Sequence, residues 1–119
     1  DDKENMYSVQ ELYDGVYKKC GVPIVFDYFH HKFCTGGLTE EEALKLAAST
    51  WPKDIVPLTH YSESRRKEKL DESIKAQAHS DLIQDKIPTY GNEFDCVIEA
   101  KHKELAVINY NEKYIYERV

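Results

Sequence analysis

Three short apolar runs of this sequence end at or beside residue types that bind divalent metal ions. The first run ends at Asp27, and His30 follows three residues later. The second run is followed by His60, and the third ends at Glu99. A mixture of carboxylate and imidazole groups suits Zn²⁺ or Mn²⁺. These four residues are therefore candidates for a metal site.

Each candidate also has a plainer structural explanation. A single histidine at the end of a strand is more often a turn or surface residue, and an Asp or Glu there is often a helix cap. Four such residues after three consecutive strands are harder to explain in this way, but the pattern alone leaves both explanations open. Two other histidines are not expected to bind metal. His31 would point away from His30 and either contact a metal ligand or serve a structural role, and His102 would lie at the surface.

The strands that would position these residues follow from the hydrophobic pattern. The run Pro23–Asp27 is nearly continuous in apolar, β-forming residues, which is typical of a strand buried on both faces. Residues 55–59 and 95–99 resemble it. Pro57 weakens the second prediction, because proline donates no hydrogen bond to a neighbouring strand.

The expected helices are marked by their ends. Ser8 with Glu11, and Thr39 with Glu42, can each form a capping box. Gly21 is suited to end the first helix. The predicted helices cover residues 8–20, a segment from Thr39 to about Pro52, residues 80–86 and residues 100–110. Residues 62–78, which include the basic pair 65–66, are predicted to form an extended loop with one helical turn. Residues 114–116 are predicted either to extend the last helix or to pair at a sheet edge.

Alternating helices and strands predict an α/β fold with a parallel sheet, and the length suits one domain over residues 1–119. In such folds the active site lies at the carboxyl ends of the strands, where Asp27, His30, His60 and Glu99 would meet. Three strands cannot close a barrel, since a full (β/α)8 barrel takes about 250 residues.

Composition limits the function classes. The net charge of −6 argues against DNA binding by this chain alone, because DNA-binding surfaces are usually basic. The apolar runs are too short to span a membrane. The three cysteines are widely spaced, which disfavours disulfides and zinc–thiolate sites and favours an intracellular, reducing compartment.

Several longer motifs carry a resemblance. The segments YSVQELY, GVPIVFDYFHHKF, GLTEEEALKLAASTW, HYSESR, AHSD and IEAKHKELA occur in this order. Together they closely resemble the UV-damage endonuclease family. The resemblance implies a (β/α)8 barrel with a cluster of divalent metals that nicks DNA on the 5′ side of UV photoproducts. The chain would then supply the last three or so βα units of a partial TIM barrel.

The resemblance also implies which residues bind metal. The family's DxxH motif corresponds to Asp27 and His30, and the histidine of HYSES to His60. The histidine of HSD corresponds to His79, and the glutamate of EAK to Glu99. All five would be ligands of divalent ions, with Mn²⁺ expected and Zn²⁺ the alternative, and Asp27, His30, His60 and Glu99 would serve catalysis.

The implied partner of the full-length protein is UV-damaged double-stranded DNA. The family draws further ligands from earlier strands, so the chain alone is expected to be inactive and could self-associate through an open sheet edge. Two rival functions remain open. One is a sugar isomerase or epimerase on a related metal-binding barrel, and the other is a non-catalytic truncated fragment.

Overall fold

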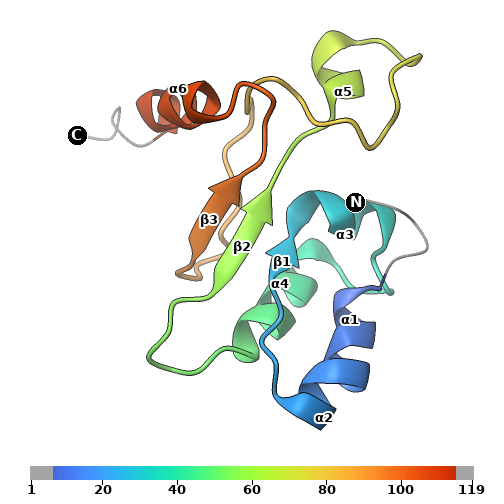
Figure 1. Cartoon of the computed structure of the whole chain (residues 1–119), viewed down its shortest axis with the longest axis vertical. Coiled ribbons are helices and arrows are strands. Elements are labelled where there is room, and N and C mark those ends of the chain that lie inside the picture. Colours follow the sequence, from blue (N-terminus) through green and yellow to red (C-terminus); the bar gives the residue numbers. More distant parts are fainter. Residues whose placement is uncertain (1–6, 115–119) are drawn as a thin grey trace. The chain divides into compact units, whose positions relative to one another are not determined.

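The computed structural model describes residues 7–114 and shows a mixed α/β fold (Figure 1). Three parallel strands form a sheet in the order β1–β2–β3, with bounds Phe26–Asp27, Leu58–Tyr61 and Asp95–Ile98. The predicted α/β class with a parallel sheet is therefore confirmed. The chain consists of two compact units. Of the described residues, the first unit comprises 7–60 and 89–97, and the second comprises 61–88 and 98–114.

The first unit begins with the helix predicted over residues 8–20. It consists of α1 (Val9–Leu12), a π-helical segment η1 (Tyr13–Tyr17) and α2 (Lys18–Cys20). Ser8 and Glu11 form the expected capping box. Gly21 ends the helix with a φ of 72°, a left-handed conformation that glycine adopts without steric cost. The π-helical segment was not predicted.

Helix α3 (Tyr28–Phe33) follows β1 directly and was not predicted. The helix forms because the Asp27 side chain accepts hydrogen bonds from its first backbone amides. The strand predicted over residues 23–27 is correspondingly short, since only its last two residues pair with β2.

Helix α4 (Glu40–Ser49) begins at the predicted capping box of Thr39 and Glu42. Its apolar side packs into the core of the first unit. Gly36, in the turn before it, has a φ of 61°, and a Cβ there would lie 2.5 Å from the Ser8 Oγ. The buried apolar residues of this unit are Val9, Ile24, Phe26, Tyr28, Phe29, Ala43, Leu44 and Ala47.

Strand β2 lies later in the chain than the predicted strand over residues 55–59. Pro57 precedes it, and the Pro57 carbonyl oxygen accepts a hydrogen bond from the Asp95 N–H at 2.9 Å. Proline can accept but not donate, so pairing through its N–H is impossible there. The strand includes His60, where it was predicted to end, and extends one residue further to Tyr61.

The described part of the second unit contains two helices, α5 (Arg65–Lys69) and α6 (Glu104–Tyr114). Helix α5, capped by Ser64, is the helical turn predicted within the long loop. Residues 80–86 form no helix, contrary to the prediction, because side-chain carboxylates accept hydrogen bonds from their amides. No helix within residues 7–114 is long and apolar enough to cross a membrane. The buried apolar residues of this unit are Tyr61, Ile83, Ile87, Ala106 and Tyr110.

Candidate metal centre

The parallel register of β1 and β2 brings two predicted ligands side by side. Asp27 lies opposite His60 in the ladder. Residues at matching positions of paired strands project from the same face of the sheet. The register therefore joins these two side chains although 32 residues separate them in the sequence.

Asp27 is also the N-cap of α3. Its Oδ1 accepts hydrogen bonds from the backbone N–H groups of Phe29, at 3.0 Å, and His30, at 2.9 Å. The helix-cap explanation that the sequence offers for Asp27 is thus correct. It does not compete with metal binding, because a carboxylate has two oxygens and about four acceptor sites.

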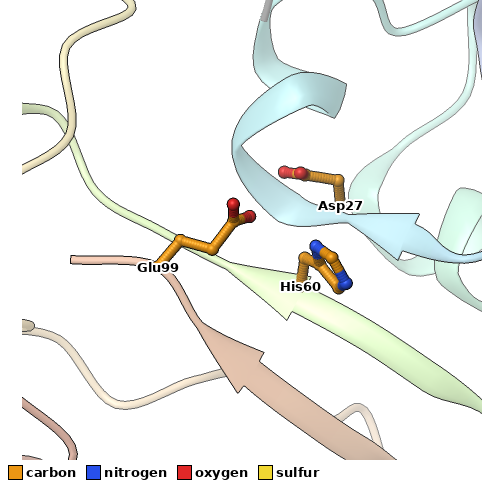
Figure 2. A group of neighbouring side chains, drawn as sticks. All are labelled: Asp27, His60 and Glu99. Atoms are coloured by element: carbon orange, nitrogen blue, oxygen red, sulfur yellow. The ribbon is translucent and has the colours of Figure 1, made fainter. Parts of the chain in front are cut away.

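Glu99 follows β3 directly, and its backbone N–H donates to the Tyr61 carbonyl oxygen at 2.9 Å. Tyr61 follows His60 in β2, so this hydrogen bond places the Glu99 backbone beside the carboxyl end of β2. Figure 2 shows the Glu99 carboxylate together with Asp27 and His60. One ligand atom from each of the three lies within 4.8 Å of the other two, and all three residues are half-buried.

This donor set fits a divalent metal ion. Two carboxylates and one imidazole offer the oxygen and nitrogen ligands that Zn²⁺ and Mn²⁺ accept. Atoms bound to one ion lie within about 4.4 Å of one another, because each is about 2.0–2.2 Å from it. The observed spacing, within 4.8 Å, needs at most a small side-chain adjustment to meet that limit.

Two further predicted ligands, His30 and His79, are not members of this group of three. His30 lies on α3, with its Nε2 3.0 Å from the Tyr7 carbonyl oxygen. A carbonyl partner requires a proton on Nε2, which places the lone pair of a neutral ring on Nδ1. His79 forms an isolated antiparallel bridge with Ser64. Their role as ligands stays a prediction.

The remaining histidines agree with the structural roles expected of them. His31 is 6% exposed, and its ring lies against Phe26 with centroids 5.6 Å apart. Burial lowers the pKa of His31, and the opposing effect of Glu40 is smaller. His31 is therefore best suited to stay neutral in the core. His102 is exposed, in the turn before α6.

The basic pair of the long loop is bound within the second unit. Arg65 forms an ion pair with Asp81, and the Arg66 Nε donates to the Ile74 carbonyl oxygen at 2.7 Å. The sequence gave no reason to single out Glu63 and Glu68, which lie in the predicted loop.

The chain is similar to known proteins along almost its whole length. The model of the family described as UV-endonuclease UvdE matches residues 1–118. A UV-damage endonuclease of Schizosaccharomyces pombe is 33% identical over 114 residues, which cover 91% of this chain and 18% of that protein. A UV DNA damage endonuclease of Nostoc sp. is 30% identical over 110 residues, covering 87% of this chain and 32% of that protein.

A solved structure shares the fold. The structure titled "Crystal Structure of SacUVDE" has a TM-score of 0.72 and 23% sequence identity, and it matches 94% of this chain and 37% of that chain. The chain thus spans about a fifth to a third of the length of these two curated relatives. On the family match over residues 1–118, the chain belongs to the UV-endonuclease UvdE family.

Proposed function

We propose that this chain forms part of a metal-dependent DNA repair endonuclease that nicks a strand on the 5′ side of UV photoproducts. The observation that carries the proposal is the group of Asp27, His60 and Glu99 in a member of the UvdE family. Two carboxylates and an imidazole at strand ends are suitable ligands for the metal ion of a hydrolytic enzyme. The names of the relatives, UV-damage endonucleases, support the substrate.

In the proposed protein, the three strands are the last of a (β/α)8 barrel, and residues 1–119 belong to one domain. The order of elements supports this assignment. A helix follows each strand: α3 follows β1, α5 follows β2 and α6 follows β3. Consecutive strands are also neighbours in the sheet, as they are in such a barrel.

The proposed metal ligands are Asp27, His30, His60, His79 and Glu99, with Mn²⁺ the expected ion and Zn²⁺ the alternative. A bound ion would stabilise charge on the scissile phosphate and lower the pKa of a water ligand. The carboxylates of Asp27 and Glu99 offset the positive charge of the centre. The imidazoles would bind in their neutral form, and the hydrogen bond between the His30 Nε2 and the Tyr7 carbonyl oxygen would orient that ring. The catalytic group would be Asp27, His30, His60 and Glu99.

The proposed partner is UV-damaged double-stranded DNA. The proposed localisation is therefore intracellular. With a net charge of −6, residues 1–119 offer little electrostatic attraction to a polyanion. DNA binding and efficient nicking would then need residues beyond these 119, and isolated chains could pair through an open sheet edge.

The test is a nicking assay on UV-irradiated supercoiled plasmid with Mn²⁺, using the 119-residue chain and a longer protein that contains it. The proposal predicts nicking by the longer protein, none on unirradiated plasmid, and little by the chain alone. Conversion of a ketose by the longer protein, without nicking, would contradict it in favour of a sugar isomerase. Nicking by the chain at the rate of the longer protein would contradict the need for further residues.

A further inference from the structure

The backbone around His79 is held against the segment that follows β2. His79 and Ser64 form an antiparallel bridge. On either side of it, the Arg65 N–H donates to the Ala78 carbonyl oxygen at 2.9 Å, and the Ser80 N–H donates to the Glu63 carbonyl oxygen at 2.8 Å. All of these residues belong to the second unit. These hydrogen bonds hold the backbone of residues 78–80, and the amides from Asp81 onward have other partners.

Glu68 binds the chain directly after His79. Its Oε1 accepts from the Asp81 N–H at 2.9 Å, and its Oε2 accepts from the Leu82 N–H at 3.1 Å. The Glu68 side chain is 8% exposed, and the Lys69 Nζ lies 3.7 Å from its Oε1. Hydrogen bonds to an ionised carboxylate are about twice as strong as neutral ones. A buried carboxylate on two successive amides therefore holds this backbone firmly.

Glu63 repeats the arrangement a few residues later. Its Oε1 accepts from the Gln84 N–H at 2.8 Å, and its Oε2 accepts from the Asp85 N–H at 3.0 Å. The Tyr61 hydroxyl also donates to Oε2, at 2.8 Å. Between them, the two glutamates satisfy four amides of a described stretch that forms neither helix nor strand. Without these acceptors the amides would need water.

We infer that Glu63 and Glu68 are positioning residues for His79. Their oxygens bind backbone amides, and neither residue belongs to the group of potential metal ligands. Their hydrogen bonds hold the backbone of residues 81–85, which follows His79 in the chain. Arg65 and Lys69 support the arrangement by pairing with Asp81. The value of a fixed His79 rests on the proposed function, in which its imidazole binds metal.

The first test is amide hydrogen exchange in the chain without metal. Glu68→Gln keeps the shape of the side chain but replaces one acceptor oxygen by an N–H₂ group that faces an amide donor. We expect exchange at Asp81 and Leu82 to rise about tenfold or more, because a partly buried amide loses its acceptor. Glu63→Gln should raise exchange at residues 84–85 instead. Glu72→Gln, at an exposed residue with the same charge change, is the matched control.

The pattern of exchange decides the first test even if a variant is destabilised. General unfolding would raise exchange throughout the second unit, whereas the inference requires a local rise that differs between the two variants. Unchanged exchange at 81–82 in Glu68→Gln, or the same pattern in all three variants, would overturn it.

The second test connects the glutamates to metal through a double-mutant cycle, with Mn²⁺ binding to the chain measured by titration calorimetry. We expect Glu68→Gln to weaken Mn²⁺ binding about 10- to 100-fold, the usual effect of losing a group that orients a ligand. His79→Ala should weaken it at least as much, and the double variant no further. Additive losses would overturn the inference, because Glu68 would then act independently of His79.

A separate outcome isolates the proposed function. If His79→Ala leaves Mn²⁺ binding unchanged, His79 is not a ligand and that part of the proposed function fails. Local exchange changes in Glu63→Gln and Glu68→Gln would still support their hold on the His79 segment.

Discussion

The backbone N–H groups of the first unit and those of residues 79–88 find their hydrogen-bond acceptors in different ways. In the first unit, helices α1 to α4 provide carbonyl partners, and short side chains such as Ser8 and Thr39 cap their first turns. In the stretch 79–88, the long side chains of Glu63 and Glu68 do the same work from another segment of the chain. Local sequence therefore determines the backbone in one region, and distant residues determine it in the other.

Removal of a core side chain should give the largest effect and should differ between the regions. Phe26, 1% exposed in the first unit, is the larger of the two side chains, so Phe26→Ala should lower the free energy of unfolding by about 3–5 kcal/mol. Ile83 is also 1% exposed, but Ile83→Ala removes fewer buried carbon atoms and should lower it by about 2 kcal/mol. Urea denaturation measures both. A larger loss from Ile83→Ala would reverse the comparison.

Gly36→Ala should have the next largest effect, because it disturbs the capping of the first helix. The added Cβ would lie 2.5 Å from the Ser8 Oγ, and the φ of 61° is already unfavourable for alanine. Loss of the cap and left-handed strain together predict about 2–3 kcal/mol. Gly37→Ala is the matched control, since its φ is 84° but nothing lies within 4 Å of the new atom. Equal losses from both variants, measured by thermal unfolding, would show that the contact with Ser8 is unimportant.

Asp27→Asn should separate helix capping from the proposed metal binding. Glu63 and Glu68 in the second unit bind backbone amides but are not proposed as metal ligands. Asparagine caps helices about as well as aspartate, so stability without metal should change little. A neutral amide is a poor metal ligand, so Mn²⁺ binding should weaken by at least about 10- to 100-fold, the loss typical of removing a group that only orients a ligand. Asp54→Asn, at an exposed position, controls for charge. Unchanged Mn²⁺ affinity in Asp27→Asn would count against the proposed site.

The smallest expected effect is a pH dependence at Tyr90. The Tyr90 hydroxyl donates to the Glu40 Oε2 at 2.6 Å, and this hydrogen bond, with smaller contributions from burial and nearby charge, raises the pKa of Tyr90 to about 12. Because the folded pKa lies above the usual 10, the stabilisation is complete below pH 10 and is lost as the pH rises through about 12. The tyrosinate absorbance of the chain minus that of Tyr90→Phe measures it. A midpoint near 10 would show that the contact is absent.

The sequence predicted best those elements that are specified by neighbouring residues. Both capping boxes and the glycine at the end of the first helix were found because each signal lies within a few residues of the element. Helix α3 was not predicted because its N-cap, Asp27, is also the last residue of the predicted strand over residues 23–27. The helix predicted over residues 80–86 was wrong because Glu63 and Glu68 bind its amides, and their effect is not visible in the local pattern.

The candidate site could be predicted in part because parallel strands align their carboxyl ends. This rule joined Asp27 and His60, whose register the structure confirms, and it led to Glu99. Strand boundaries were less certain, since Pro57 shifts β2 toward the end of the chain. The rule says nothing of His79, which lies in a loop between strands, and its assignment came from the family resemblance.

The capping hydrogen bonds of Asp27 would affect the entropy of the proposed metal binding. Two backbone amides hold its Oδ1, so the side chain has already lost most of its rotational freedom before an ion arrives. A side chain that is ordered in advance forfeits less conformational entropy on binding, and affinity rises without any added contact. Folding of α3 would thus raise the affinity of the proposed metal centre. By linkage, an ion that binds only the folded chain stabilises this helix in return.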